Sequence, residues 1–544
     1  MNYEEKKDEV RQLFKKFKGD RPIESLIIVD AIQRLGLDHH FQEEIDETLI
    51  LQQQYYHEYD SNTTCVHKYQ TLHDVSLFFR LSRQHGHYVS ADVFNKFKGK
   101  DGKFMREIRG DINGLMELYE AVQLSFEGEY ILDEANKFSS QILHEYLAAN
   151  YTDSSDWSKM LVISNKLRHP FHKNIPRILM TESYFKDFGG WTNDSGTTLR
   201  ELASMDLQMR LSVYQEELIQ FSKWWNQVGL TKNDLKHARN QPLKWYTWSM
   251  AIRIDDSSFS WRRVELTKSI AFIYLIDDIF DLYGTLDELI SFTEAINRWD
   301  YAAIETLPNY MKMCYRALLD TTNEIGRKIY KKYGFNPIDS LKTTWVNLCN
   351  AFLIEAKWLT SRDLPPADEY LENGKVSSGV HVVLVHLFFL LGNGQADINR
   401  PAAGAVHLND MSQIISSMAT ILRLLDDLGT AKDEHQDGKD GSYVECYRKE
   451  NVGLSVEQAR EHVNDMVASE WKRLNKECFF NLNHVVSASS FIKASLNLAR
   501  MVPLMYSYDD NQRLPVLEEY VNFMFFNPET SLDLEHLHQD RTTI

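Results

Sequence analysis

The sequence predicts an all-α protein. Apolar residues recur at helical spacing along nearly every long segment, as in the stretch from Ile23 to Leu35, which stops at Gly36. Alternating segments rich in Val, Ile and Thr and joined by Asn-Gly or Asp-Gly turns, which are typical of sheets, do not occur. Only 24 Gly and 12 Pro stand among the 544 residues, too few for a collagen-like, low-complexity or disordered chain. A large helical core is therefore expected.

The chain is long enough for more than one domain. The segment from Tyr184 to Leu202 (YFKDFGGWTNDSGTTLREL) concentrates Gly, Asp, Asn, Ser and Thr between two helical stretches. We place the domain boundary there. The prediction is a helical domain over residues 1–202 and a larger helical domain over residues 203–544.

Charge and cysteine usage restrict the partners and the compartment. Acidic residues outnumber basic ones by 78 to 60, and a formal net charge of −18 repels the phosphate backbone of nucleic acids. The five cysteines are far apart and form no CxxC pair, which is typical of reduced thiols inside a cell. We expect no nucleic acid partner, and a protein that is a monomer or a weak homodimer.

Two further segments bear on localisation. The longest apolar stretch, Val380 to Leu391, contains two histidines and is shorter than the roughly 20 residues that cross a bilayer. The charged start, MNYEEKK, resembles neither a secretory signal nor a transit peptide. The chain as given is expected in the cytoplasm, with the plastid as the alternative if a transit peptide has been removed.

An acidic motif ends the apolar stretch SIAFIYLIDDIFDLYG, residues 269–284. Asp277 and Asp281 are four residues apart and so share one helical face, one turn from each other. Carboxylates on an apolar helix are costly to bury unless something binds them. Hard oxygen ligands without Cys or His suit Mg²⁺ better than Zn²⁺. For a single motif, a solvated acidic helix end is the alternative.

A second acidic stripe lies downstream in ILRLLDDLGTAKDE, residues 421–434. Asp426, Thr430 and Glu434 follow one another at intervals of four residues on one face, whereas Asp427 and Asp433 fall off that face and are expected to support it or to be solvated. Two such stripes that face each other across a bundle could hold several divalent ions, with open positions for phosphate oxygens. The pair predicts a diphosphate substrate.

The two motifs together resemble the metal motifs of class I terpene synthases. RQHGHYVSADVF, NRWD and SSGVHVVLVH resemble segments of the plant members, and the resemblance covers most of the chain. It implies a terpene synthase-like α-bundle preceded by an α/α barrel-like helical domain that serves as scaffold and cap. It also implies three Mg²⁺ ions, for which Mn²⁺ can substitute, bound by Asp277, Asp281, Asp426, Thr430 and Glu434, with Asp278 in support.

Two arginines are candidates for binding the diphosphate beside the metal-binding Asp277 and Asp281. Arg423 precedes Asp426 by three residues, close to the same face. Arg239 begins Arg239-Asn240-Gln241, where most cyclising members of the family carry an Arg-x-Arg pair. One cation of that pair is missing here. A surface salt bridge is the alternative for either arginine.

Aromatic side chains are expected around the substrate, because a carbocation needs electron-rich faces rather than lone pairs that would trap it. The candidates are Trp248, which matches a pocket tryptophan of the family, Tyr506 and, more weakly, Tyr274. Plain core packing is the alternative for each. Gly379 reads as a break in a helix, whose freed carbonyls could face the cavity, or as a close-packing position.

Two motifs of related proteins are absent. A DxDD motif, which would indicate class II chemistry, does not occur in the front part, and the tandem-arginine motif RRx8W is also missing. With Arg239-Asn240-Gln241, this resembles the subgroup that releases acyclic alcohols. The expectation is Mg²⁺-dependent ionisation of geranyl or farnesyl diphosphate and capture of the cation by water.

The product and the competing hypotheses follow from that reaction. Capture at the tertiary carbon, which carries more of the positive charge, would give linalool or nerolidol, and capture at the primary carbon would give geraniol or farnesol. The alternatives are a cyclising mono- or sesquiterpene synthase and a helical protein that binds diphosphate without turnover. A chain-elongating prenyl transferase would need a second DDxxD, which Asp426 to Glu434 does not provide.

Overall fold

Helices make up the secondary structure of the part of the chain that the computed structural model describes. That part comprises residues 2–17, 22–60, 70–150, 157–175, 194–230, 235–252, 259–361, 363–394, 407–430, 441–481, 489–508 and 513–525. Within these ranges the strand-like structure amounts to an isolated bridge between Lys98 and Phe104. The all-α prediction is confirmed.

The chain divides into two compact units, and the first consists of Met1–Arg210 with Asn475–Asn483. Its elements are α1 (Tyr3–Phe17), α2 (Pro22–Arg34), η1 (Asp38–His40), α3 (Gln42–Asp60), α4 (Leu72–Gln84), η2 (Ala91–Phe97), η3 (Arg106–Gly110), α5 (Ile112–Val122), α6 (Tyr130–Asn150), α7 (Trp157–Arg168), η5 (Phe171–Lys173), the first part of α9 (Asp194–Val228) and η14 (Glu477–Asn481). As the sequence predicts, α2 stops before Gly36, which has a φ of 65°.

Buried ion pairs hold the core of the first unit together. Arg80 in α4 is fully buried and donates to Asp30 in α2 at 2.6 Å and to Glu117 in α5 at 2.5 Å. Because a buried charge is costly without its partner, these contacts fix the three helices relative to one another. Thr71 caps α4 by accepting from the Asp74 N–H at 3.1 Å. These contacts stabilise the helical packing of the first unit.

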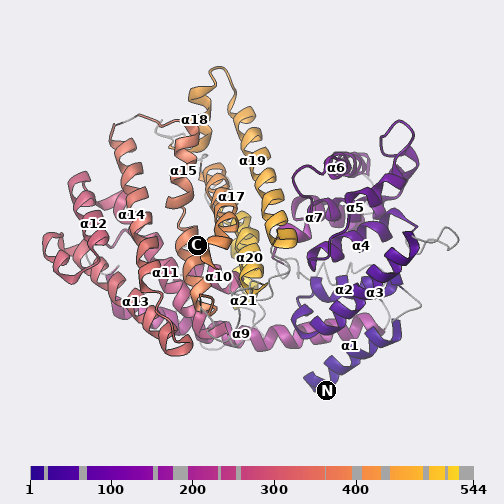
Figure 1. The fold of residues 1–544 in the computed structure, drawn as a ribbon, viewed down its shortest axis with the longest axis horizontal. Coiled ribbons are helices and arrows are strands. Elements are labelled where there is room, and N and C mark those ends of the chain that lie inside the picture. The colour runs from indigo at the N-terminus through magenta and orange to yellow at the C-terminus, as the bar shows by residue number, and fades with distance from the viewer. Residues whose placement is uncertain are drawn as a thin grey trace. The chain divides into compact units, whose positions relative to one another are not determined.

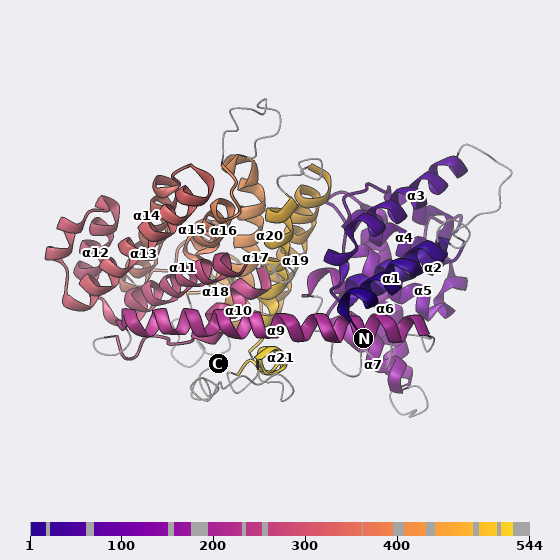
Figure 2. The ribbon, with the colours of Figure 1, turned by 90° about the horizontal axis from the view of Figure 1, so that it is seen from below.

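The predicted boundary segment continues into a long helix. Residues 184–193 lie outside the described residues, and Asp194–Val228 forms the 35-residue helix α9, labelled in Figure 2. The division between the two compact units falls inside α9, after Arg210. The domain boundary at residue 202 remains a prediction.

The second unit consists of Leu211–Leu474 and His484–Ile544. After the rest of α9, its elements are α10 (Pro242–Ile252), α11 (Ser260–Asp278), η9 (Ile279–Tyr283), α12 (Leu286–Arg298), η10 (Tyr301–Thr306), α13 (Asn309–Tyr333), α14 (Ile338–Ser361), α15 (Ala367–Ser377), α16 (Val380–Leu390), η12 (Leu408–Met411), α17 (Ser412–Thr430), α18 (Tyr443–Glu450), most of α19 (Val456–Lys476), α20 (Ser489–Met505) and α21 (Pro515–Phe525). Helices α14, α15 and α17 lie side by side (Figure 1).

Helix α11 delivers the first acidic motif from the core of this unit. It packs against α10, α13 and α16, and most of its residues are buried. The helix widens at the motif into the π-helical turn η9, closed by a bond from the Gly284 N–H to the Ile279 carbonyl at 2.9 Å. Such turns are rare and recur at functional sites. Asp277 and Asp278 end the α-helix, and Asp281 lies in the wider turn.

Gly379 separates α15 from α16 with a φ of 71°, so the predicted helix break is present. Residues Ala367–Leu390 are long and apolar enough to cross a membrane by length and composition, but 72% of that window is buried inside the protein. This is typical of a core helix in a folded domain. Within the described residues it is the only candidate span.

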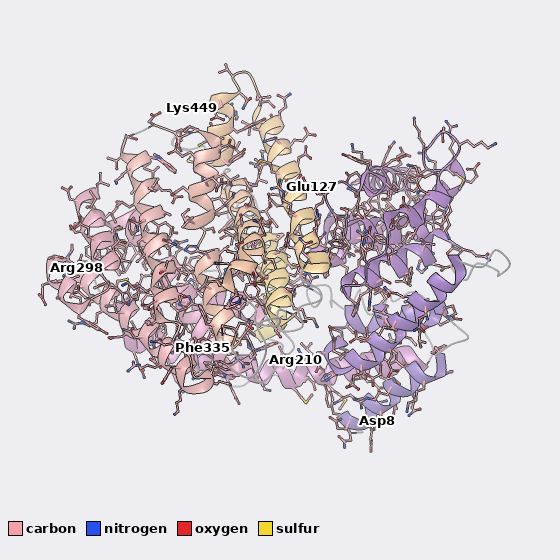
Figure 3. The ribbon with its side chains drawn as sticks, viewed as in Figure 1. Asp8, Glu127, Arg210, Arg298, Phe335 and Lys449 are labelled. Atoms are coloured by element: carbon pink, nitrogen blue, oxygen red, sulfur yellow. The ribbon has the colours of Figure 1, made fainter. Side chains whose placement is uncertain are left out.

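Charged side chains lie on the outside of each unit. Asp8 in the first unit and Arg298 and Lys449 in the second point outward (Figure 3), and each is more than half exposed. Charged side chains of both signs are solvated there. The buried acids of the second unit are therefore exceptions that require an explanation.

Candidate functional site

A cavity of about 240 Å³ lies within the second unit, among α10, α11, α14, α15, α16, α17 and α20. Most of the candidates from the sequence line it, although they are spread over more than 250 positions of the chain. They are Arg239, Trp248, Tyr274, Asp277, Arg423, Asp426 and Tyr506. The fold thus brings the two acidic motifs to one place.

Arg239 binds the first acidic motif directly. Its backbone N–H and its Nε donate to the two carboxylate oxygens of Asp278, at 2.6 and 2.7 Å, and its Nη2 donates to Asp277. Its guanidinium also lies 4.9 Å from the ring centre of Tyr274. Burial alone would lower the pKa of Arg239, but the charges of Asp277 and Asp278 raise it overall. Arg239 is therefore a permanent cation at the cavity wall.

Arg423 binds the second acidic motif in the same manner. Its Nη2 donates to Asp426 at 2.8 Å, and its Nε donates to Asp427 at 2.8 Å. Asp427 is almost fully buried and also accepts from the Tyr370 hydroxyl at 3.1 Å and from the Tyr443 N–H at 2.8 Å. Asp427 thus supports the site, one of the two roles expected for it, and aims Arg423 toward Asp426.

The carboxylates of the two motifs repel one another. Partial desolvation, followed by the charge of Asp277, raises the pKa of the solvent-exposed Asp281 above its ordinary value. Burial, followed by the charge of Asp427, raises the pKa of Asp426 to about 6 against the opposing pull of Arg423. Crowded carboxylates without nitrogen or sulfur ligands fit a hard divalent cation such as Mg²⁺.

Part of the predicted ligand set cannot be placed. Thr430 is the last residue of α17, and its side chain lies outside the described residues, as do Asp433 and Glu434. The metal role of these residues remains a prediction from the sequence. Asp277, Asp281 and Asp426 are the members of the set whose side chains the structure describes.

The three aromatic candidates form one connected group at the cavity. The indole N–H of Trp248 donates to the Tyr274 hydroxyl at 3.0 Å, and the rings of Trp248 and Tyr506 lie 6.4 Å apart. Tyr274, the weakest candidate from the sequence, belongs to the cavity wall as much as the other two. The group offers aromatic faces beside the charged residues.

Sequence reasoning missed Glu355 of α14. Its Oε1 accepts from the Ser377 hydroxyl at 2.6 Å and from the Asn373 amide at 3.2 Å. Burial raises its pKa to about 7, with further contributions from Asp277 and Asp427 against the opposing charge of Arg423. Its signal in the sequence was an acid inside the apolar stretch AFLIEAKW.

Lys244 of α10 was missed as well. It lines the same cavity and is only 6% exposed. Its signal was a lysine flanked by Leu243 and Trp245 in a helix that is otherwise almost wholly apolar. Gln241, at the position of the missing second arginine, also lines the cavity.

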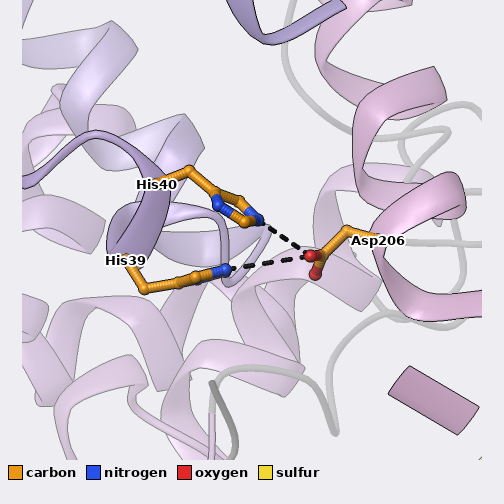
Figure 4. A group of neighbouring side chains, drawn as sticks. All are labelled: His39, His40 and Asp206. Atoms are coloured by element: carbon orange, nitrogen blue, oxygen red, sulfur yellow. Dashed lines mark hydrogen bonds and ion pairs between the residues drawn. The ribbon is translucent and has the colours of Figure 1, made fainter. Parts of the chain in front are cut away.

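A separate polar group lies in the first unit. His39 and His40 of η1 point toward Asp206 of α9 (Figure 4), with His40 Nε2 at 2.9 Å and His39 Nε2 at 3.8 Å from its Oδ1. Their ligand atoms are close enough to bind a metal ion. However, Arg210 donates to His39 and Asp206, and the Tyr3 hydroxyl donates to Asp206 at 2.9 Å. Because a guanidinium already occupies this group, we assign it the structural role of joining α1, η1 and α9.

Comparison with known families and proteins agrees with this geometry. Residues 1–167 match the model of the terpene synthase N-terminal domain, and residues 227–473 match that of the terpene synthase metal binding domain. A chloroplastic tricyclene synthase of Antirrhinum majus is 60% identical over 96% of this chain and 87% of its own length. An (E)-nerolidol synthase of Cannabis sativa is 48% identical over 93% of this chain and 89% of its own.

A solved structure shows the same fold. Isoprene synthase from Populus x canescens, in complex with three Mg²⁺ ions and dimethylallyl-S-thiolodiphosphate, superposes with a TM-score of 0.83. The two proteins are 31% identical, and the match covers 97% of each chain. Like these relatives, the chain described here belongs to the plant terpene synthase family, whose members are lyases that act on diphosphates.

Proposed function

We propose that the protein ionises a linear prenyl diphosphate, geranyl or farnesyl diphosphate, with Mg²⁺ as its cofactor. One observation carries the proposal. Two arginine–carboxylate groups from distant parts of the chain, Arg239 with Asp277 and Arg423 with Asp426, line a single cavity together with aromatic residues. Cations, metal-binding carboxylates and aromatic faces are the three components that ionisation of an allylic diphosphate requires.

The chain's own residues would act on the leaving group first. Asp277, Asp281, Asp426, Thr430 and Glu434 would hold three Mg²⁺ ions, and bound Mg²⁺ neutralises charge on a diphosphate. When the carbon–oxygen bond breaks, its electron pair leaves with the diphosphate. The guanidinium N–H groups of Arg239 and Arg423 would then donate hydrogen bonds to the diphosphate oxygens that gain charge. The three-ion complex of isoprene synthase supports this assignment.

The aromatic group would act on the other fragment. The faces of Trp248, Tyr274 and Tyr506 carry negative electrostatic potential and attract an allylic cation without reacting with it. The hydrogen bond between Trp248 and Tyr274 fixes both rings and leaves the tyrosine oxygen occupied as an acceptor. This arrangement would stabilise the allylic cation until water or a carbon–carbon double bond reacts with it.

For the product, we propose an acyclic alcohol, linalool or nerolidol, formed by water at the tertiary carbon. The single arginine in Arg239-Asn240-Gln241 and the similarity to a nerolidol synthase support this choice. A cyclic product is the second candidate, because a relative at 60% identity is a tricyclene synthase. Geraniol, from capture at the primary carbon, is the third.

Incubation of the purified protein with Mg²⁺ and geranyl or farnesyl diphosphate tests both levels of the proposal. We expect a prenyl alcohol in gas chromatography, with chiral analysis to give its hand. If no alcohol or hydrocarbon rises above the metal-free blank, the proposed function is wrong, and binding of diphosphate without its release would indicate a non-catalytic protein. A mixture dominated by cyclic hydrocarbons would decide for cyclisation.

We also propose that residues 203–544 contain the catalytic domain and that residues 1–202 serve as its scaffold. For the compartment, the chloroplastic relative favours the plastid over the cytoplasm that the N-terminal residues suggested. Imaging of the complete gene product fused to a fluorescent protein tests this. The compartment matters because it decides which diphosphate is available to the enzyme.

A further inference from the structure

Lys244 is a buried cation at the cavity wall that the described residues leave without an acidic partner. It is 6% exposed, and no carboxylate of the described residues lies within 4.0 Å of its ammonium. The ring centre of Tyr508 lies 5.8 Å from its Nζ. Arg239 and Arg423, in contrast, each bind two carboxylates.

Burial of an ammonium without a paired carboxylate is costly. A buried ammonium loses part of its hydration, and the described residues offer it no paired anion in return. Burial, followed by the charge of Arg239, lowers the pKa of Lys244 to about 8, with Asp426 acting in the opposite direction. An anion placed in the cavity would reverse this balance and hold the lysine in its charged form.

The position of Lys244 matches the cation that the sequence lacks. Gln241 stands where the second arginine of the family's Arg-x-Arg pair would be, and Lys244 follows it by three residues. The first helical bond of α10 runs from the Trp245 N–H to the Gln241 carbonyl at 3.0 Å, so Gln241 and Lys244 are one turn apart. Both side chains line the same cavity as Arg239.

We propose that Lys244 is the third cation of the diphosphate site and takes over the role of the missing arginine. The proposal rests on the proposed function. When the allylic carbon–oxygen bond breaks, the electron pair and the negative charge move to the diphosphate. The Lys244 ammonium donates hydrogen bonds to the diphosphate oxygens. No group is oxidised or reduced, and the lysine keeps its proton.

The test compares Lys244→Met, which removes the charge and keeps the length, with Lys244→Arg, which keeps the charge. Lys357→Met is the matched control, because Lys357 is exposed on α14. Calorimetry would measure the binding of inorganic pyrophosphate in Mg²⁺, a readout that does not depend on turnover. We expect the Kd of Lys244→Met to rise about tenfold or more, and those of Lys244→Arg and Lys357→Met to stay near wild type.

Lys244→Gln is a second neutral variant, and circular dichroism shows which variants are folded. A folded neutral variant that binds pyrophosphate as tightly as the wild type overturns the proposal. Failure of the proposed function looks different, since the wild type itself would then release no diphosphate from geranyl or farnesyl diphosphate. The role of Lys244 is supported if Lys244→Met and Lys244→Gln both lose pyrophosphate binding while Lys244→Arg still binds pyrophosphate.

Discussion

Arg239 and Asp278 form a two-point contact in which the backbone N–H and the Nε of the arginine bind the two oxygens of one carboxylate, at 2.6 and 2.7 Å. The Asp278 side chain is only 5% exposed, so its contribution is to hold Arg239 rather than to meet the substrate. The pair connects the segment before α10 to the end of α11. The positioning of the cation therefore depends on the second aspartate of the motif.

Replacement of Asp278 by Ala should misplace Arg239. We expect kcat/KM to fall about 10- to 100-fold, the range typical of residues that orient a ligand-binding group. Asp278→Asn keeps one acceptor oxygen and should lose less. Steady-state kinetics with the accepted prenyl diphosphate measure both variants. Asp287→Ala on the exposed start of α12 is the control, and equal kinetics for Asp278→Ala and this control would contradict the positioning role.

Arg423 should contribute to stability as well as to turnover, because it neutralises the buried Asp427. Arg423→Met leaves that carboxylate without its counter-ion, and we expect a loss of about 3 kcal/mol in the free energy of unfolding. The double variant Arg423→Met/Asp427→Asn should regain part of this stability and none of the turnover. Urea unfolding and product formation measure the two effects separately. Recovery of turnover in the double variant would show that Arg423 does not contact the diphosphate.

Gly374 leaves the space that Arg423 occupies. A Cβ at Gly374 would lie 2.7 Å from Cδ and 2.8 Å from Cγ of Arg423, whose guanidinium is tied to Asp426 and Asp427. Gly374→Ala should therefore shift Arg423 and lower kcat/KM about 10- to 100-fold. Since Ala favours a helix over Gly by about 1 kcal/mol, the thermal midpoint should not fall in parallel.

The matched control for Gly374→Ala is Gly441→Ala, because a Cβ at Gly441 meets no atom within 4 Å. That variant should keep both activity and stability. If Gly374→Ala had the same kcat/KM as the control, a shift of the Arg423 side chain would not affect turnover. The inference that turnover depends on the exact position of Arg423 would then be wrong.

The helices and the two acidic motifs could be predicted because they depend on local patterns. Apolar residues at helical spacing predict α11 and α17. Asp277 and Asp426 each follow a long apolar run, which is typical of a buried helix and not of a surface helix. Residues whose importance depends on distant partners carry no such signal. Lys244 is the single charge of α10, whereas Glu355 is one of several charges in α14, and the surroundings of both become apparent only once the helices are packed.

Two features of the backbone also escaped the sequence pattern. A π-helical turn at Ile279–Tyr283 follows from tertiary packing and not from a period that the residues display. The Gly- and Asp-rich segment before Leu202 suggests an interruption between two helical stretches, yet from Asp194 it is part of α9. Helix packing outweighs the weak local preferences of such residues.

His386 provides a test of stability that is independent of catalysis. It is fully buried in α16, and its Nδ1 donates to the Val382 carbonyl at 2.8 Å, while the described residues offer its Nε2 no hydrogen bond. Burial lowers the pKa of His386 to about 4. The folded protein therefore holds this imidazole neutral at pH values where the unfolded chain, with an ordinary pKa of about 6.5, already protonates it.

The unfolded state thus binds more protons than the folded state between about pH 6.5 and pH 4, and stability must fall as the pH falls through that window. His386→Phe keeps a ring against Trp345, which lies 5.7 Å away, and removes the titration. Relative to its value at pH 7.5, the free energy of unfolding at pH 5 should fall by about 2 kcal/mol less in the variant than in the wild type. Urea unfolding at both pH values measures this difference, with exposed His407→Phe as the control. If the wild type and His386→Phe lost equal stability on acidification, the buried imidazole would have to be charged in the folded protein, and a carboxylate near α16 would have to compensate for it.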